Sequence, residues 1–416
     1  MFLTKQEKMM QQGEYGPGVQ KSMDLLVRYG EAFDAERMVR ANSAHVLIDY
    51  RPEPLLSELT EGARVNTLTT VHPKFVDPRL ATELSIVDKA EVNEIQQAFD
   101  HVSDLGKKAG FIQTFTCSQY LIGNLPQIGG FSSWTGTSGQ VIGNSWFGVR
   151  LNRDGASANL ATAITGRIPY MGLLRPENRY GEVLTELNNL DIEDFNEAHY
   201  GALGYYLGAI IEGRTMVING IPLNIPLDQC KYLLSPLPVS GAVALCYIVG
   251  VSPEAPTLEA ALRNRVPKER VIVEKKDLRK TWEELNTAID EDVDLVTLGC
   301  PHLSITEIKD IASLLEGKKI NTNVNLTLGV SKPVYTLAKE TGYAGIIEEA
   351  GGIFHDSCAG ASNPFLRFGK GVKTIATNSA RAAHYTVRET KAEVFYGSYE
   401  SCVSSAITGK WRDEFK

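Results

Sequence analysis

The sequence is poor in features that mark several large classes of protein. Its 416 residues hold only six cysteines, too few and too widely spaced for the disulfide framework of a small secreted domain. No basic block is present, and the formal net charge of −8 argues against nucleic acid or an anionic membrane surface as a partner. The most apolar stretch, residues 239–251, falls short of the roughly 20 residues that cross a bilayer. The first residues are typical of a charged helix rather than a signal peptide, so we expect a cytoplasmic protein.

The composition that remains fits a soluble enzyme with a large core. Hydrophobic residues make up 43% of the chain and charged residues 22%, and both values are ordinary for globular proteins. At roughly 150 residues per domain, the length allows two or three domains. We expect two, residues 1–265 and 266–416, and leave a further division of the first part open.

The strand and helix pattern is clearest between residues 270 and 360. Strands are expected at 271–273, 294–298, 320–328 and 352–354, and helices at 277–288, 305–315 and 332–341. This alternation predicts βαβ units with a parallel sheet and helices on both faces, which is the α/β fold class. The earlier part predicts helices at 3–12, 20–33 and 89–108, and short strands at 43–50 and 64–71.

Three cysteines stand out by their position. Cys300 ends a predicted strand and Cys358 follows another, which places both at the carboxyl edge of the sheet, where ligand sites gather. Helix N-termini at that edge favour thiolates. Cys117 lies among hydroxyl residues and glycines, unlike a core residue, whereas Cys246 lies in an apolar run and is expected in the core. The alternatives are buried structural cysteines for the first two and an ordinary loop cysteine for Cys117.

No two cysteines have the spacing of a Cys-x-x-Cys metal motif. A common site of Cys117, Cys300 and Cys358 would therefore have to be assembled by the fold. Three thiolates without a fourth would suit an iron–sulfur cluster with one iron left open, and such an iron is a Lewis acid for a substrate oxygen.

Longer motifs surround these cysteines along most of the chain. They read YGPG at 15–18, GARV at 62–65, GNSWFGVRLNRDG at 143–155, LATAITGR at 160–167, LGCPH at 298–302 and ATNSARAA at 376–383, with Thr116, Cys117, Gly123 and Asn124 in addition. On these motifs, the chain resembles the large, catalytic subunit of the aconitase X family.

The resemblance implies aconitase-like α/β/α parallel-sheet domains and a hydro-lyase activity. Cys117, Cys300 and Cys358 would hold an iron–sulfur cluster, which in this family is either a four-iron or a two-iron type. The open iron would bind the leaving hydroxyl group and a substrate carboxylate, while a base removes the neighbouring carbon-bound proton.

The resemblance also implies a protein partner. The family uses a small swivelling domain that closes the site and is thought to supply a serine base. The domain is fused in some members and separate in others. Because the chain ends at Lys416, we expect a separate small subunit.

Known members of the family dehydrate 5-phosphomevalonate or cis-3-hydroxy-L-proline. At the substrate-contact positions of the phosphomevalonate type, this chain carries Leu47, Ile48 and Asp49 for Gly-Val-Ser, His72 and Pro73 for Asn-Pro, Gly136 and Thr137 for Glu-Ser, and Arg381 for a late lysine. These departures argue against phosphomevalonate without establishing hydroxyproline.

Two of the replacements indicate the kind of substrate. Asp49 would repel a phosphate but pair with an amine or imine, unless it faces solvent or pairs with Arg51. Arg381 offers a bidentate fork for a carboxylate. We therefore expect a small hydroxy acid, with amino and imino acids among the candidates.

Three further residues are candidates for catalysis. His302 could hydrogen-bond a cluster sulfur or help protonate the leaving hydroxyl group, and its alternative is a residue that merely enters a helix. Asn144 and Ser145 could orient the substrate, although Asn and Ser also close tight turns.

Two other classes of function stay open. A metal-free enzyme would use Cys300 or Cys358 as a nucleophile beside a histidine. A non-catalytic subunit would result if the departures at His72 and Gly136 had emptied the site.

Overall fold

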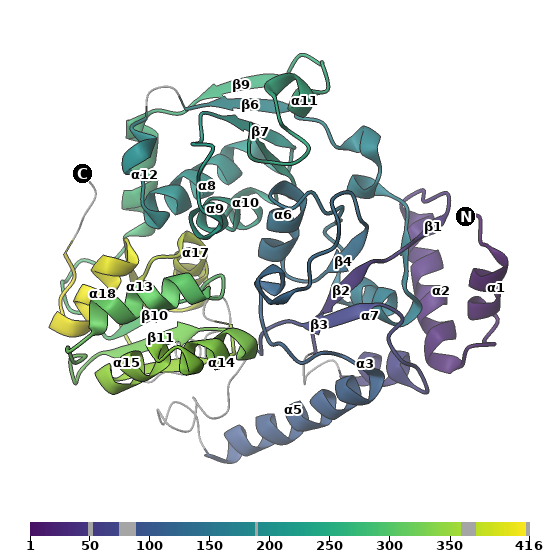
Figure 1. Cartoon of the computed structure of the whole chain (residues 1–416), viewed down its shortest axis with the longest axis horizontal. Helices are drawn as coiled ribbons and strands as arrows, with labels where there is room; N and C mark the ends of the chain where they lie inside the picture. The colour runs from purple at the N-terminus through teal and green to yellow at the C-terminus, as the bar shows by residue number, and fades with distance from the viewer. Residues whose placement is uncertain (49–52, 75–88, 188–189, 359–371, 413–416) are drawn as a thin grey trace.

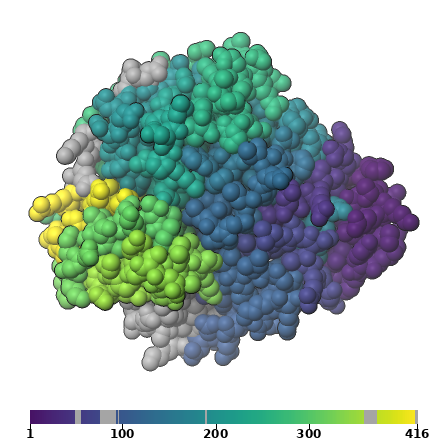
Figure 2. Space-filling model, in the orientation of Figure 1, coloured from purple at the N-terminus to yellow at the C-terminus, as the bar shows by residue number. Residues whose placement is uncertain are grey.

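Three regions follow one another along the chain, each built on a parallel sheet (Figure 1). The computed structural model of the chain describes residues 1–48, 53–74, 89–187, 190–358 and 372–412. Figure 2 shows the C-terminal region, in green and yellow, packed closely against the blue segments of the N-terminal region. Within these described ranges, we find no helix with the length and apolar character to span a membrane.

The N-terminal region is built on a three-stranded sheet. Strand β2 (Ser43–Val46) lies between β3 (Leu68–Val71) and β4 (Ser132–Trp134) and is parallel to both. A separate antiparallel pair joins β1 (Met38–Arg40) to β5 (Arg167–Pro169). The helices are α1 (Lys5–Gln11), α2 (Pro17–Ala32), α3 (Glu53–Thr60), α5 (Lys89–Ala109), α6 (Thr137–Ser145) and α7 (Ala156–Thr165). The helices predicted at 3–12, 20–33 and 89–108 are thus confirmed as α1, α2 and α5.

The middle region carries a four-stranded parallel sheet. Its strands follow the order β8 (Cys246–Ile248), β7 (Met216–Asn219), β6 (Val183–Glu186) and β9 (Glu269–Ile272). Its helices are α8 (Glu197–Ile211), α9 (Leu227–Leu234), α10 (Leu237–Gly241), α11 (Leu258–Leu262) and α12 (Lys275–Leu285). Helix α8 packs against α9, α10 and α12, and the core of this region also includes Val141 and Ile142 of α6.

Strand β9 corrects one expectation. The alternation of strands and helices places the strand at 271–273 in the same sheet as those that follow it, whereas β9 pairs with β6, with Val183 opposite Glu269. The physical reason is that residues with high strand propensity specify an extended segment but not its hydrogen-bonding partner. The division of the chain at residue 265 stays a prediction.

The C-terminal region confirms the predicted α/β sheet. Its five parallel strands follow the order β12 (Gly352–His355), β11 (Asn325–Gly329), β10 (Leu295–Leu298), β13 (Thr374–Thr377) and β14 (Glu393–Tyr396). The helices are α13 (Ile305–Leu315), α14 (Lys332–Glu340), α15 (Tyr343–Ala350), α17 (Ala380–Glu389) and α18 (Tyr399–Thr408). Helix α13 begins at a capping box. The Ser304 side chain accepts a hydrogen bond from the Glu307 N–H, and the Glu307 side chain accepts one from the Ser304 N–H.

The order of these strands positions the candidate site. Cys300 follows the central strand β10, and Cys358 follows the edge strand β12, so both cysteines lie at the carboxyl edge of one parallel sheet, as predicted. Gly299 makes the turn after β10 possible, because its φ of +97° suits glycine and a side chain there would lie 2.3 Å from the Gly329 carbonyl oxygen. Helix α17 lies between this sheet and α8 of the middle region (Figure 1).

Candidate active site

The three predicted cysteines converge, although they are distant in the sequence. The backbone N–H of His302, two residues after Cys300, donates a hydrogen bond to Cys117 Sγ at 3.2 Å. Cys358 interacts electrostatically with both of the other thiols, which also interact with each other. The fold therefore assembles from three separate segments a thiol group that no spacing motif indicates.

His302 connects all three cysteine segments. Besides its N–H contact with Cys117, its imidazole Nε2 donates to the carbonyl oxygen of Ser357, the neighbour of Cys358, at 3.0 Å. Its own carbonyl accepts from Ser118 Oγ at 3.2 Å. Burial lowers the pKa of His302 to about 3, so the imidazole is neutral at pH 7. With Nε2–H as the donor, Nδ1 carries the lone pair, and it has no partner among the described residues.

Cys300 is buried, Cys117 is half-buried, and a positive charge lies near both. Burial raises the pKa of Cys117 to about 11 and that of Cys300 to about 12. Arg381 opposes this rise at both thiols. Cys300 also packs against Ala382 in the first turn of α17, so a helix N-terminus faces it, as predicted. The predicted lowering of the thiol pKa is wrong, because burial outweighs the helix N-terminus. An uncharged thiol is a poor nucleophile and a poor metal ligand, so these cysteines would bind a metal only with loss of their protons, which a bound metal itself promotes.

Arg381 reaches from α17 into the N-terminal region. Its Nη1 donates to Thr137 Oγ1 at 3.1 Å and to the Ser235 carbonyl oxygen at 3.4 Å, and its guanidinium lies over the ring of Tyr385. Two residues expected to contact substrate, Thr137 and Arg381, are therefore side by side. Arg381 also lies within electrostatic reach of Cys117 and Cys300.

A pair of histidines lies near Arg381 and His302. His45 Nε2 lies 3.2 Å from His72 Nδ1, and His45 Nδ1 lies 2.8 Å from Thr70 Oγ1, which accepts from Asn124. Burial lowers the pKa of His45 to about 3 and that of His72 well below its ordinary value, with help at His72 from the charge of Arg381. Both imidazoles are therefore neutral at pH 7.

Gly136 leaves room for His72. A side chain at this glycine would place its Cβ 2.4 Å from His72 Cε1, and the φ of +84° further disfavours any other residue. The two departures from the family pattern at positions 72 and 136 thus compensate each other in space. The imidazole takes the volume that a side chain at 136 would need, so the departures do not leave a void.

The segment after His72 also contacts the segment of Cys358. Pro73 is buried, and the next residue, Lys74, accepts from the Cys358 N–H at 2.9 Å through its carbonyl oxygen. Lys74 Nζ lies 3.0 Å from Asp356 Oδ1. These contacts attach the predicted substrate-contact pair His72–Pro73 to the cysteine site.

Other predicted site residues have different surroundings. Asn144 uses both its oxygen and its nitrogen on the backbone of Leu151, on the Ala244 carbonyl and on Arg179. Ser145 Oγ accepts from the Cys246 N–H at 2.9 Å. The catalytic role expected for these two residues stays a prediction that their contacts do not favour.

The predicted contacts after β2 can be followed only in part. Ile48 is buried and Leu47 is half-buried. Both side chains are hydrocarbons, so neither can hydrogen-bond a substrate. Asp49 lies outside the described residues, and its predicted contact with an amine or imine is not described by the structure.

Two residues near the site were not singled out by sequence patterns. His45 lies in a strand whose four residues are all buried, and Lys231 is completely buried in α9. Lys231 Nζ donates to the His302 carbonyl oxygen at 3.3 Å. The signal available for Lys231 is its position, because it lies four residues after Leu227 and three before Leu234, on the apolar side of a short helix.

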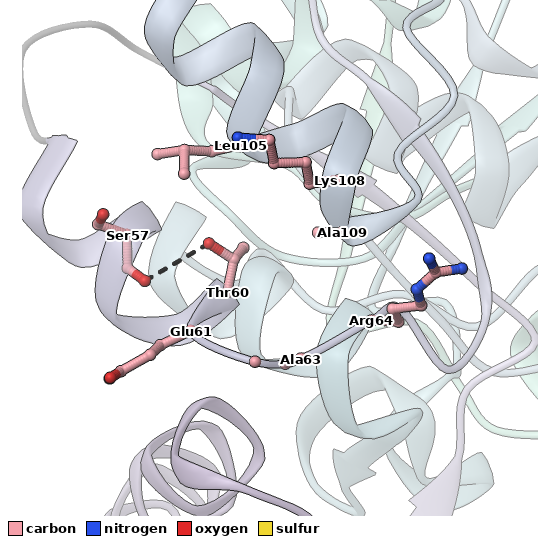
Figure 3. Close-up of a pocket in the computed structure, with 9 residues that line it drawn as sticks. Ser57, Thr60, Glu61, Ala63, Arg64, Leu105, Lys108 and Ala109 are labelled. Carbon is pink, nitrogen blue, oxygen red and sulfur yellow. Dashed lines mark hydrogen bonds between the residues drawn. The ribbon is translucent and has the colours of Figure 1, made fainter.

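A surface pocket lies apart from these residues. It has a volume of about 490 Å³ and opens between α3 and the end of α5 (Figure 3). Figure 3 shows Ser57 and Thr60 on one side and Leu105 and Lys108 on the other. None of the described residues that line it is a cysteine or a histidine, and none belongs to the cysteine site. We therefore assign it no function.

Comparison with known proteins identifies the family. Family models for the aconitase X first, second and third domains match residues 1–177, 181–283 and 293–408. The phosphomevalonate dehydratase large subunit of Methanocaldococcus jannaschii is 34% identical over 96% of this chain and 98% of its own length. The cis-3-hydroxy-L-proline dehydratase of Pseudomonas aeruginosa is 29% identical over 96% of this chain and 68% of its own length.

A solved structure leads to the same family. The crystal structure of Thermococcus kodakaraensis aconitase X, in its holo-form, matches with a TM-score of 0.85 and 30% identity, and covers 98% of this chain and 100% of that chain. The expected aconitase-like fold is thereby confirmed, and the named relatives are dehydratases, that is, hydro-lyases. The chain therefore belongs to the aconitase X family of hydro-lyases.

Proposed function

We propose that the chain is the large subunit of a dehydratase that removes water from a small hydroxy acid. Its cofactor would be an iron–sulfur cluster held by Cys117, Cys300 and Cys358. The observation that carries this proposal is the convergence of these thiols around His302.

The donors present at the site suit such a cluster. Within the described ranges, no group of three or more His, Cys, Asp or Glu side chains is close enough to hold a single metal ion. Cluster ligands need not meet at one atom, because each cysteine binds a different iron. Three soft sulfur donors with Arg381 beside them fit an anionic iron–sulfur cluster better than a hard ion, which prefers oxygen ligands. When bound, a cluster with an iron left open supplies a Lewis acid for the leaving hydroxyl group.

Arg381 and His72 would bind and orient the substrate. The guanidinium of Arg381 is held on one side by Thr137 and the Ser235 carbonyl, so its remaining N–H groups can donate to a carboxylate. The imidazole of His72 is neutral and fixed by His45, so it can hydrogen-bond a polar group without adding charge. Both groups suit a hydroxy acid with a carboxylate.

His302 would hold the site together rather than transfer a proton. Its Nε2–H is committed to the Ser357 carbonyl and its imidazole is neutral at pH 7. It therefore lacks the proton that protonation of a leaving hydroxyl group requires. The base that removes the carbon-bound proton is expected on a small subunit, and the proposed partner is that swivel-domain chain.

The relatives support a separate small subunit. Five of the seven named relatives are large subunits. The M. jannaschii protein is covered over 98% of its length, whereas the P. aeruginosa dehydratase, which is named without a subunit, is covered over 68%. The small-subunit partner proposed here rests on the large-subunit names of these relatives. We place both chains in the cytoplasm.

The substrate class follows from the contact residues. Phosphomevalonate and cis-3-hydroxy-L-proline both carry a carboxylate and a hydroxyl group that leaves, so Arg381 would serve either. Arg153 lies within electrostatic reach of Arg381 and donates to the Ala242 carbonyl oxygen, so its remaining N–H groups could also serve an anionic group of the substrate. The departures from the phosphomevalonate type at the contact positions, and not the cations of the site, make amino and imino hydroxy acids the first to test.

The test is anaerobic spectroscopy of the chain co-expressed with its small partner. We expect a brown protein with iron, sulfide and a broad band near ~400 nm, lost in Cys358→Ala. Cys246→Ala is the matched control, because this cysteine is buried in the core of the middle region, and it should keep the band. A folded, colourless, iron-free wild type would contradict the cluster and leave a thiol nucleophile or a non-catalytic role.

A further inference from the structure

Lys231 is a buried cation whose partners connect two regions of the molecule. Its side chain has no exposed surface and pairs with Glu307, which is also buried, while Asp228 lies 3.9 Å away. Helix α9 of the middle region carries Lys231, and α13 of the C-terminal region carries Glu307. The lysine donates in addition to the His302 carbonyl oxygen at 3.3 Å.

This ion pair is not explained by stability. Removing two charges from water costs about as much as their attraction returns, and apolar residues of the same size often stabilise a fold equally well. What an apolar pair cannot do is donate a hydrogen bond to His302. The ion pair therefore holds the Lys231 ammonium group where it can donate to the His302 carbonyl oxygen, which a hydrophobic side chain could not do.

The partners of Lys231 hold the turn that follows Cys300 at both ends. At one end, Lys231 and Ser118 donate to the His302 carbonyl. At the other end, Glu307 accepts from the Ser304 N–H at 2.7 Å and Asp228 accepts from Ser304 Oγ at 2.7 Å. The turn is thus anchored to α9 as well as to its own helix.

We infer that Lys231 is a positioning residue for the cysteine site. It fixes His302, which contacts the segments of all three cysteines, and it adds a positive charge within electrostatic reach of Cys117. The part of this inference that concerns a cluster rests on the proposed function, whereas the fixing of the His302 turn does not.

The charge has a measurable consequence for a bound cluster. Loss of a nearby cation makes reduction less favourable, and loss of a nearby anion makes it more favourable. Lys231→Met should therefore shift the reduction potential of the cluster to a more negative value, and Glu307→Gln should shift it to a more positive one. A purely structural role would not produce shifts of opposite sign.

The experiment is a potentiometric titration of the anaerobically purified complex, monitored by EPR. Lys231→Arg should lie closer to the wild type than Lys231→Met. The matched control is Arg167→Met, which removes one member of a partly buried ion pair with Glu7 in the N-terminal region and should keep the wild-type potential. If Lys231→Met does not fold, Lys231→Met with Glu307→Gln replaces the pair by two neutral side chains. Because the two expected shifts of potential oppose each other, this double variant is measured by hydrogen exchange, which tests the loss of the donor.

A second measurement does not need the cluster. Hydrogen exchange of the apoprotein, followed by mass spectrometry over residues 300–304, should be roughly tenfold faster in Lys231→Met, as expected for loss of one hydrogen bond. Arg167→Met should exchange at this turn like the wild type. Unchanged potential and unchanged exchange in Lys231→Met would overturn the inference. A wild type without iron would overturn the proposed cofactor, and the exchange rates alone would then decide on Lys231.

Discussion

At the scale of single residues, the position of His72, a predicted substrate contact, depends on the lack of a side chain at Gly136. Gly136 has a backbone conformation that other residues avoid, and the ring of His72 occupies the space beside it. His72 is in turn held by His45. The two imidazoles and the glycine therefore pack together, and the effects of substitutions at positions 72 and 136 on stability should be coupled.

Gly136→Ala should destabilise the protein, and part of the cost should depend on His72. Overpacking costs about 1–3 kcal/mol, and the positive φ adds about 1–3 kcal/mol for a residue with a side chain. In a His72→Ala background only the backbone cost remains. The free energy of unfolding of the two single variants and the double variant, from urea titrations, measures the coupling. Equal costs of Gly136→Ala in both backgrounds would show that the ring does not fill this space.

The same scale shows what the sequence can and cannot predict. Cys300 and Cys358 were predictable, because the carboxyl ends of parallel strands meet at one edge. The approach of Cys117 was predicted only through the family resemblance, because no spacing rule links residues 185 positions apart, as Cys117 and His302 are. Lys231 looks like any helical lysine until the packing of α9 shows that its surroundings are closed.

At the scale of elements, helix α8 approaches its neighbours through a face of glycines. A Cβ added at Gly204 would lie 2.0 Å from the Leu233 carbonyl oxygen of α9, and one at Gly208 would lie 2.1 Å from Ser240 Oγ. This close approach fixes α9 and therefore the position of Lys231. Glycine in a helix costs about 0.5–1 kcal/mol relative to alanine, so the fold accepts a weaker helix in exchange for close packing.

Gly204→Ala should therefore be destabilising by roughly 2 kcal/mol or more, because the helices must separate. Gly345→Ala is the matched control in helix α15, where an added Cβ meets nothing within 4 Å. This control should gain up to about 1 kcal/mol. Thermal unfolding of both variants beside the wild type measures the difference. An equal stabilisation of both would mean that α8 and α9 are not in close contact.

Elements also differ in how far the sequence defines them. The capping box of Ser304 and Glu307 locates the start of α13 within the chain itself, and the structure confirms it. The partner of β9 is not encoded in its own residues, because pairing with β6 depends on how two distant segments pack. Local start signals are therefore predictable where long-range strand order is not.

At the scale of the whole molecule, buried polar residues join the middle and C-terminal regions. Glu197, at the start of α8, accepts from the Tyr399 N–H at 2.6 Å and from Asn378 Nδ2 at 3.5 Å. Asn378 also donates to Tyr232 Oη at 3.0 Å. These contacts connect α8 to the residue after β13 and to the first residue of α18. They join the same two regions as the Lys231–Glu307 pair. The cysteine site thus lies near the interface of the middle and C-terminal regions, and the stability of this interface depends on ionisable groups.

Glu197 at this interface should make the free energy of unfolding depend on pH. Burial raises the pKa of Glu197 from 4.5 to about 7. Between these values the folded protein holds a proton that the unfolded chain releases, so the stabilisation is present below pH 4.5 and is lost as the pH rises through 7. The loss is on the order of 3 kcal/mol.

Glu197→Gln should remove this loss, because the amide is uncharged at every pH and its oxygen can still accept from Tyr399. The free energy of unfolding of the variant should exceed that of the wild type at pH 8, and the difference should shrink steadily toward pH 5. Urea titrations at four pH values between 5 and 8 measure it. Glu193→Gln is the control, since Glu193 is exposed and its curve should parallel the wild type. If the Glu197→Gln curve also runs parallel to the wild type, the carboxyl group is already ionised in the folded protein, and the two regions are joined through a charge that the fold tolerates.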